Sequence, residues 1–239
     1  MSKRAVVLAG GLGSRLRPYT TIIPKPLMPL GERPILEILL RQLAHQGFTQ
    51  VDLCVGYLAH LIRAFFGDGS AFGIHIEYHE EREPLGTIGA LAVIPDFSPD
   101  EPILVMNGDI LTDLDFSDVV ARHVERGFDA TVCVTRRQVD VDFGVIDVAH
   151  DGHMVGYREK PSTEIIVSIG VNVVQASSIA AITPGERIDV PAFMQRLMAE
   201  KRHVHCHVID GFWLDLGRVD DYQEANDLVA AEPGRFLPT

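Results

Sequence analysis

Short apolar runs alternate with amphipathic stretches along the first half of the chain. Residues 5–9 form an apolar run with glycines behind it, as expected of a buried strand that enters a turn. Residues 34–46 carry apolar side chains at helical spacing, with a proline at the start and Gly47 just beyond the end. This order favours a parallel sheet with crossover helices. The same pattern predicts strands over residues 51–55, 74–78 and 103–106, and helices over residues 58–66 and 86–94.

The second half is richer in strands, with fewer helices between them. Asp151-Gly152 is the expected turn of a hairpin. We therefore expect an α/β fold: one domain with a Rossmann-like, doubly wound, mixed but mainly parallel sheet flanked by helices. Strands are predicted over residues 130–135, 144–148, 154–158, 166–174, 204–209 and 212–216, and helices over residues 191–201 and 219–230.

Length and composition suit a globular protein. The chain has 239 residues, of which 46% are hydrophobic, so there is ample material for a buried core. No apolar run approaches the roughly 18 residues of a membrane span. The run at residues 5–9 is too short for a signal peptide. We therefore expect a cytoplasmic protein with no membrane partner.

The formal net charge is −12 at pH 7, counting histidine as neutral. An acidic surface repels nucleic acid and anionic lipid, so neither is an expected partner. A phosphate ligand would then need a local positive site, made by a few arginines and lysines or by a metal ion.

The cysteines and the late histidines do not form a recognisable metal or disulfide pattern. The cysteines are far apart in apolar, strand-like runs, which favours buried thiols in a reducing compartment: Cys54, Cys133 and Cys206. Three histidines alternate along one strand, which favours an exposed strand face over a metal site because no fourth ligand accompanies them: His203, His205 and His207.

A glycine-rich loop follows the first strand. Residues 9–18 read AGGLGSRLRP, and glycines let backbone N–H groups approach an anion closely. The dinucleotide fingerprint would need a glycine where Leu16 stands, and the Walker pattern would need a lysine directly after Gly13. Neither of these two phosphate-binding designs therefore fits.

The loop instead carries positive side chains. Arg15 and Arg17 can fork onto phosphate oxygens, and Lys25, held between two prolines, is a positioned point charge. From glycines and charges alone, a tight surface turn with solvated basic residues stays a strong alternative.

Residues 8–18, together with the Pro-Lys-Pro-Leu of residues 24–27, resemble the sugar-phosphate nucleotidyltransferase family, the pyrophosphorylases that make nucleotide sugars. The resemblance runs from about residue 6 to residue 228 and implies the GT-A-like fold of nucleotide-diphospho-sugar transferases. Residues 1–239 would form one nucleotidyltransferase domain, with residues 1–115 mainly binding the nucleotide and residues 116–239 mainly the sugar phosphate. We expect no C-terminal hexapeptide-repeat β-helix domain of the kind that larger relatives append.

The resemblance also implies a nucleotide site. In this family the loop backbone holds the nucleotide, Arg15 engages the β and γ phosphates, and Lys25 contacts the α phosphate. Residues 83–90 resemble the base-recognition turn, in the Pro-Leu-Gly-Thr form of members that act on GTP with mannose or manno-heptose 1-phosphate. A small helix-start turn would have the same sequence. The implied nucleotide-binding residues are Leu8, Ala9, Gly10, Gly11, Gly13, Ser14, Arg15, Lys25, Leu85, Gly86, Thr87 and Gly108.

Two aspartates are candidates for a metal site. Asp109 directly follows an apolar strand, and ligands of an open parallel sheet bind beyond the carboxyl ends of its strands. Asp215 is a second acid between apolar residues. Each alone is more often a helix or turn cap. Together, in a protein that must neutralise a triphosphate, they suggest Mg²⁺. The family's Asn-Gly-Asp and Trp-x-Asp-x-Gly motifs match both positions and imply the same metal site.

The acceptor side depends more heavily on the resemblance. Without it, Glu159 and Lys160 are a surface charge pair that closes a strand. The resemblance makes Lys160 the partner of the sugar phosphate, with Glu159 accepting hydrogen bonds from sugar hydroxyls. It also places the backbone of Gly144 at the sugar and Asn172 at the sugar hydroxyls.

These expectations define a reaction. A phosphate oxygen of the sugar 1-phosphate attacks the α phosphorus of a nucleoside triphosphate in line, and pyrophosphate leaves. The nucleophile is already an anion, so catalysis would come from positioning and charge neutralisation by Arg15, Lys25, Lys160 and Mg²⁺.

The favoured substrates are GTP and a mannose or D-glycero-D-manno-heptose 1-phosphate, and a homodimer is left open. The alternatives are uridylyl, thymidylyl or cytidylyl transfer to another sugar 1-phosphate, a non-sugar acceptor such as a phosphocholine-like group, and a nucleotide-sensing module without turnover.

Overall fold

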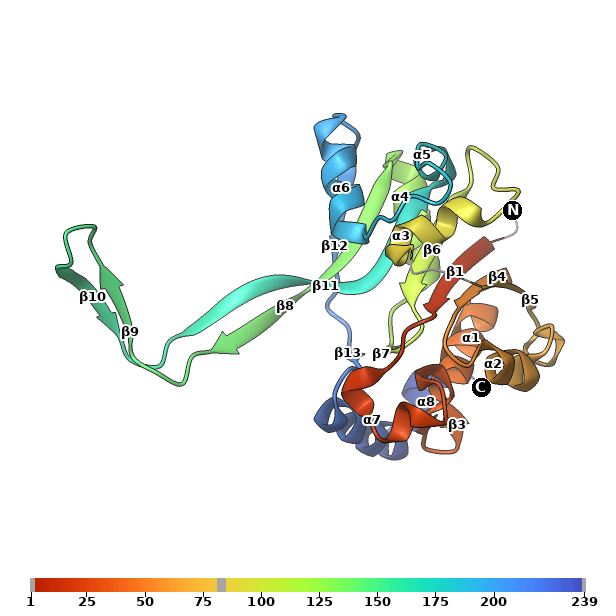
Figure 1. Ribbon diagram of the computed structural model, residues 1–239, viewed down its shortest axis with the longest axis horizontal. Coiled ribbons are helices and arrows are strands. Elements are labelled where there is room, and N and C mark those ends of the chain that lie inside the picture. Colours follow the sequence, from red (N-terminus) through yellow and green to blue (C-terminus); the bar gives the residue numbers. More distant parts are fainter. Residues whose placement is uncertain (1–2, 81–84, 238–239) are drawn as a thin grey trace.

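The computed structural model describes residues 3–80 and 85–237 and contains a central seven-stranded sheet in the order β12-β8-β11-β6-β1-β4-β5 (Figure 1). All neighbouring pairs are parallel except those of β11, which runs antiparallel to both β6 and β8. The predicted mixed, mainly parallel sheet is therefore confirmed. Its strands are β1 (Lys3–Ala9), β4 (Phe48–Val55), β5 (His75–Glu80), β6 (Pro102–Asn107), β8 (Ala130–Asp140), β11 (Ser162–Gln175) and β12 (Val204–Val208).

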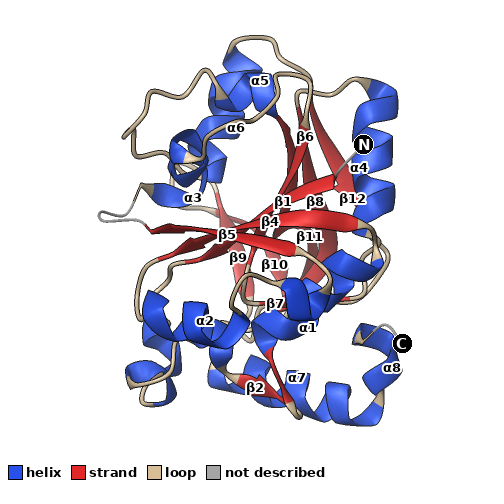
Figure 2. Ribbon diagram, turned by 90° about the vertical axis from the view of Figure 1, so that its right-hand side faces the viewer, coloured by secondary structure: helices blue, strands red, loops and turns tan. Residues whose placement is uncertain are grey.

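Helices cover both faces of this sheet (Figure 2). On β1, Ala5 and Val7 point into one core with helices α1, α2 and α4, whereas Val6 points into another with α3 and α6. Successive side chains of a strand face opposite sides, so a strand buried on both faces is apolar throughout. The helices are α1 (Ile35–His45), α2 (Ala59–Phe66), α3 (Gly86–Gly89), α4 (Phe116–Arg126), α5 (Ala176–Ile179), α6 (Val190–Ala199), α7 (Val219–Ala231) and α8 (Pro233–Phe236).

Shorter elements complete the chain. Three two-stranded sheets pair β2 (Pro29–Leu30) with β3 (Arg33–Pro34), β7 (Ile110–Thr112) with β13 (Trp213–Asp215), and β9 (Val145–Val148) with β10 (Met154–Arg158). The 3₁₀ turns are η1 (Ser14–Leu16), η2 (Tyr19–Thr21), η3 (Lys25–Leu27), η4 (Ser70–Phe72) and η5 (Ala90–Val93). In the parts of the chain that are described, no helix is long and apolar enough to cross a bilayer.

The strand order creates a switch point beside β1. The chain passes from β1 to β4 on one side and later returns to β6 on the other. At the carboxyl ends of these strands, the Gly108 N–H donates to the Leu8 carbonyl at 2.9 Å. In open α/β sheets, ligands bind in the crevice outside such a switch point.

Helix α4 is absent from the elements predicted above, although its end signals are present. The Asp115 side chain accepts a hydrogen bond from the Asp118 N–H at 2.9 Å, and Gly127 ends the helix with φ of 63°. Phe116, Val119 and Val120 form its buried face.

Strands β8 and β11 are longer than predicted, and their outer parts leave the body as a two-stranded ribbon (Figure 1). The β9–β10 hairpin lies at its tip, with the predicted turn at Asp151-Gly152, where Gly152 has φ of 90°. We call residues 136–168 the arm.

One expectation about the cysteines is wrong. Cys54 and Cys133 are buried, and burial raises the pKa of the Cys133 thiol to about 12. Cys206 is exposed, because β12 is the edge strand of the sheet. On the same strand His205 is exposed and His207 half-buried, as expected of a mainly exposed strand face.

Candidate functional site

The glycine-rich loop leaves β1 at the switch point and folds into consecutive 3₁₀ turns. Gly13 has φ of 59°, its carbonyl accepts from the Leu16 N–H at 3.0 Å, and the Thr20 hydroxyl donates to the same carbonyl at 2.7 Å. A Cβ at Gly13 would lie 2.9 Å from the Thr20 Cγ2. The turn therefore requires glycine here for both backbone conformation and space.

A third apolar cluster anchors this loop to the end of the chain. Leu16 is 1% exposed and packs in the same cluster as Leu216, the residue after β13. Since buried side chains fix the backbone around them, Arg15 and Lys25 project from a rigid support. The buried members are Leu16, Met28, Leu30, Ile35, Ile38, Leu111, Leu214, Leu216, Ala225, Val229 and Phe236.

Four charged side chains converge above the switch point. Lys25 is 7% exposed, and its ammonium group forms an ion pair with the Asp109 carboxylate. The Leu216 N–H donates to the Asp109 carbonyl at 3.1 Å, which holds the Asp215 segment beside Asp109. A Cβ at Gly217 would lie 2.8 Å from the Asp215 Oδ2 and 3.0 Å from the Arg15 Nη2.

The pKa of Asp215 responds to the other three charged side chains. Burial raises the pKa of Asp215 above its usual range, and the negative charge of Asp109 raises it further, whereas Lys25 and Arg15 act in the opposite direction. Two partly buried carboxylates side by side favour a cation between them. The structure thus brings together four of the residues proposed from sequence for phosphate and metal binding: Arg15, Lys25, Asp109 and Asp215.

The remaining glycines of the proposed nucleotide site differ in their surroundings. A Cβ at Gly108 would lie 3.1 Å from both the Leu8 carbonyl oxygen and the Val7 Cγ1, so the tight contact between the two strand ends requires glycine. At Gly11, no atom of the described residues lies within 4 Å of the corresponding position. Its backbone is open for an approaching group, and Ser14, later in the same loop, is exposed.

The proposed base-recognition turn packs against α6. Gly86 has φ of 78°, the Thr87 N–H donates to the Asp189 Oδ1 at 3.1 Å, and the Val190 N–H donates to the Thr87 hydroxyl at 2.9 Å. Leu85 lies just before this turn, while Glu83 and Pro84 fall outside the described residues. The turn is therefore a helix start, and its role in base recognition stays a prediction.

The acceptor candidates divide between the arm and the body. On the arm, the Tyr157 hydroxyl donates to the Glu159 Oε2 at 3.0 Å, and a Cβ at Gly144 would lie 2.7 Å from the Tyr157 Cζ. Lys160 follows with φ of 42°, an unusual conformation for a residue other than glycine. Gly144 precedes β9, and Glu159 and Lys160 follow β10, so the three form one group at the junction between the ribbon and the β9–β10 hairpin, which projects away from the body (Figure 1).

Asn172 lies in the body on β11, opposite Val105 of β6, and is 3% exposed. Within residues 3–80 and 85–237, no group donates to its Oδ1. A buried acceptor of this kind is costly unless it binds a donor. A ligand hydroxyl or amine fits this position.

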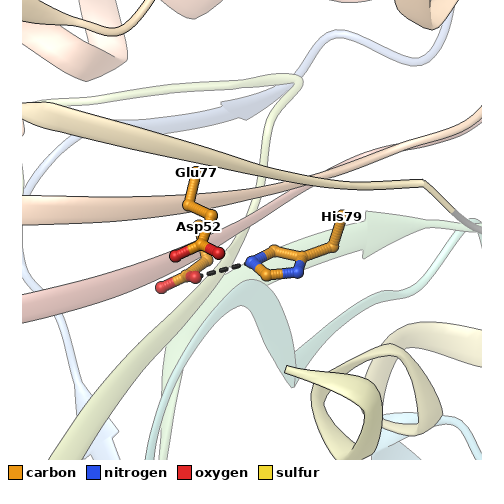
Figure 3. A group of neighbouring side chains, drawn as sticks. All are labelled: Asp52, Glu77 and His79. Atoms are coloured by element: carbon orange, nitrogen blue, oxygen red, sulfur yellow. Dashed lines mark hydrogen bonds and ion pairs between the residues drawn. The ribbon is translucent and has the colours of Figure 1, made fainter. Parts of the chain in front are cut away.

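A second cluster of charged residues lies elsewhere on the sheet (Figure 3). Asp52 of β4 is fully buried, and its carboxylate accepts from the Arg4 Nε at 2.6 Å and the Arg4 Nη2 at 3.0 Å. The His79 Nε2 lies 2.7 Å from the Asp52 Oδ1, and Glu77 is adjacent. Because the Arg4 guanidinium already neutralises Asp52, we interpret this cluster as a structural ion-pair network rather than a metal site. Sequence reasoning missed it, since it exists only through the β1–β4–β5 pairing.

A cavity of about 870 Å³ lies at the opposite end of the sheet from the switch point. It is lined by residues at the amino ends of strands, including Lys3, Phe48 and Pro102, and by Val120 of α4. The charged candidates described above do not line it, so cavity size does not locate the proposed site.

Comparison with known proteins agrees with this geometry. Residues 4–232 match the family model described as nucleotidyl transferase. The chain belongs to this family. The fold of this chain is similar to that of solved structures. HddC from Yersinia pseudotuberculosis aligns with it at a TM-score of 0.72 and 25% identity, over 95% of this chain and 99% of the HddC chain.

Relatives in the nucleotidyl transferase family differ in the nucleotide and sugar that they use. A UTP–glucose-1-phosphate uridylyltransferase of Synechocystis sp. is 32% identical over 93% of this chain and 62% of its own length. The catalytic subunit beta of a mannose-1-phosphate guanylyltransferase of Danio rerio is 31% identical over 97% of this chain and 69% of its own. The chain thus spans less than two thirds of the first of these relatives, and similar identities to both leave base and sugar undecided.

Proposed function

We propose that this chain transfers a nucleotidyl group from a nucleoside triphosphate to a sugar 1-phosphate and releases pyrophosphate. The observation that carries the proposal is the convergence of Arg15, Lys25, Asp109 and Asp215 at the switch point of the sheet. An acidic protein with a net charge of −12 needs such a local positive site to bind a triphosphate.

In this proposal, Arg15 binds the β and γ phosphates and Lys25 the α phosphate, while the open backbone at Gly11 approaches the nucleotide. Asp109 and Asp215 would hold Mg²⁺, which prefers one or two carboxylates completed by phosphate oxygens and water. The raised pKa of Asp215 beside Asp109 fits this role, because a bound cation would relieve the repulsion between the two acids. When bound, the metal supplies charge neutralisation to the phosphates.

On the acceptor side, Lys160 binds the phosphate of the sugar 1-phosphate, Glu159 accepts from its hydroxyls, and Asn172 offers its unpaired Oδ1. No general base is needed, because the attacking phosphate oxygen is already ionised. Residues 1–115 would mainly bind the nucleotide and residues 116–239 the sugar phosphate. We place the reaction in the cytoplasm, because a triphosphate is its proposed substrate.

We favour GTP with a mannose or manno-heptose 1-phosphate, on the basis of the Leu85-Gly86-Thr87 turn and the guanylyltransferase relative. Uridylyl transfer is the specific alternative, since the Synechocystis relative is equally similar.

A matrix assay tests the proposal. Four nucleoside triphosphates are combined with mannose, heptose, glucose and N-acetylhexosamine 1-phosphates in the presence of Mg²⁺, and pyrophosphate release is measured. We expect turnover with GTP and a manno-configured sugar phosphate, and a turnover lowered by roughly 10²–10³-fold in the Lys25→Ala variant. Binding of a triphosphate without pyrophosphate release from any pair would instead identify a nucleotide-sensing module.

A further inference from the structure

The arm is exposed along its whole length although it carries many apolar side chains. None of residues 136–168 is buried. Exposed apolar surface of this extent marks an interface, and an isolated two-stranded ribbon is only marginally stable in water. Phe143 is the most exposed, at 77%. The large exposed apolar residues of the arm are Val139, Phe143, Ile146, Val148, Met154, Val155, Tyr157, Ile165 and Ile166.

The pairing of the arm strands holds it away from its own body. The β8–β11 ladder runs without interruption from Ser162 opposite Asp140 to Ser168 opposite Val134, and only beyond Ser168 does the register shift. The arm is thus a direct continuation of the central sheet (Figure 1). Within the uninterrupted ladder the ribbon cannot fold back, so its direction relative to the body is set at the register shift between Ser168 and Asn172.

The arm is long enough to reach a second molecule. Residues 135–140 of β8 extend roughly 20 Å at about 3.3 Å per residue, and this ribbon carries Glu159 and Lys160 at its outer end. A folded chain of this length has a radius of gyration of about 18 Å. An arm from one copy can therefore span the distance to the switch point of a neighbouring copy.

The body offers a matching apolar surface at that place. The loop between Gly11 and Lys25 exposes Leu12, Tyr19 and Ile22, together with Ile23. Ile22 and Ile23 precede Pro24 and the buried Lys25 in the chain, and the Lys25 ammonium group forms the ion pair with Asp109. Apolar residues are therefore exposed both on the arm and around the centre that its acceptor residues would have to reach.

We propose that two copies of this chain exchange their arms, so that Glu159 and Lys160 of one copy complete the acceptor site at the Lys25–Asp109 pair of the other. This inference rests on the proposed function, because it assigns the acceptor role to Lys160. A two-fold axis makes the exchange reciprocal, so both arms and both loops are covered in one closed dimer. Each site is then composite, and a single chain lacks the groups that hold the sugar phosphate.

Complementation between two variants of low activity tests the composite site. Lys25→Ala and Lys160→Ala chains with different affinity tags are co-expressed, and the heterodimer is purified through both tags. In an exchanged heterodimer, one site combines both substitutions and the other has neither, so we expect about half of the wild-type turnover per dimer. Each homodimeric variant should have a turnover lowered by roughly 10²-fold or more. An inactive heterodimer, or a fully active Lys160→Ala homodimer, would overturn the composite site.

A shortened arm tests the exchange without any activity assay. Asp140 lies opposite Ser162, so an Asn-Gly turn can replace residues 141–161 and close the ladder as a hairpin. The body should stay folded, because no buried residue is removed. We expect the wild type to sediment as a dimer and the shortened variant as a monomer of little-changed Tm. A monomeric wild type or a dimeric shortened variant overturns the exchange.

Sedimentation and pyrophosphate release together distinguish a failure of the arm exchange from a failure of the proposed reaction. An arm-dependent dimer that releases no pyrophosphate with any substrate pair overturns the proposed reaction and keeps the exchange. An active wild type whose mixed heterodimer is inactive overturns the exchange and keeps the reaction.

Discussion

Replacing Asp52 by asparagine should strongly destabilise the fold while leaving the proposed site intact. Asp52 is fully buried, and the Arg4 guanidinium, with a side chain 7% exposed, binds it through two nitrogens. Asparagine preserves the shape of the side chain but removes the charge. Arg4 would then have only neutral acceptors, which are the asparagine oxygen and the carbonyls of Pro95 and Asp96, each at 3.5 Å, together with the face of the Phe97 ring at 4.5 Å. In the flipped orientation of its amide, the Gln50 oxygen accepts from the Arg4 Nη2 and Nε at 3.3 Å, but it carries no compensating charge either.

The magnitude follows from this burial. Removing one partner of a buried ion pair typically costs about 3–5 kcal/mol, because the other charge is left without compensation. For a chain of this size, each kcal/mol lowers Tm by about 2–4 °C, so the expected drop is about 6–20 °C. Differential scanning calorimetry and urea unfolding at pH 7 measure it. The matched control is Glu77→Gln in the same cluster, which should change stability by less than about 0.5 kcal/mol because Glu77 is exposed.

Two results would refute this reasoning. A loss below about 1 kcal/mol for Asp52→Asn would mean that Arg4 and Asp52 are not a buried, mutually dependent pair. A wild-type Tm that falls on chelation of divalent ions, and does not fall in Asp52→Asn, would mean that the cluster holds a metal. We expect chelation to leave both proteins unchanged in the absence of nucleotide.

Three other predictions concern the loop, the ion pair and acid stability. Lys25→Ala and Asp109→Ala should each lower kcat by roughly 10²–10³-fold, measured as pyrophosphate release, whereas the exposed neighbour Arg17→Ala should have a far smaller effect. Gly13→Ala should destabilise the protein by about 1–2 kcal/mol in urea, since alanine would be strained at φ of 59° and would crowd Thr20. Despite its burial, hydrogen bonds from His79 and Arg4 hold the pKa of Asp52 below its usual range. The ionised Asp52 carboxylate therefore contributes fully to the free energy of unfolding above about pH 3.9, its pKa in the unfolded chain. This contribution is lost as the pH falls through the lower pKa of the folded state, so the difference in unfolding free energy between wild type and Asp52→Asn should become smaller there.

Local sequence signals were sufficient for the core of the fold. The apolar run of β1, the proline and glycine at the ends of α1, and the alternation of strand and helix each act over a few residues, and each was predicted correctly. Helix α4 has signals of the same kind, with Asp115 before it and Gly127 after it, so local sequence is sufficient to predict this helix as well. The wrong expectation for Cys206 is different, because an edge strand cannot be distinguished from a central one within five residues.

Long-range pairing explains what the sequence could not provide. Arg4, Asp52 and His79 lie on three different strands, and their contacts depend on the strand order and on a register that places Asp52 opposite Glu77. The extension of the arm beyond the body is also not determined by local sequence. The alternating residues of β8 and β11 predict strands, but a pattern with period two does not reveal which face another part of the molecule will cover.

The residues of the candidate site differ in how strongly the strand order constrains their positions. The loop and Asp109 follow adjacent parallel strands, so the strand order alone places them together, and the β7–β13 pairing adds Asp215. Strand order does not fix the positions of Glu159 and Lys160 in this way. The ribbon that carries them extends from the sheet, and its direction depends on the backbone at its base. A motif specifies which chemical groups a reaction needs, but it carries no information on whether one chain or two supply them. The direction of the ribbon depends on its base, where the β8–β11 register shifts between Ser168 and Asn172.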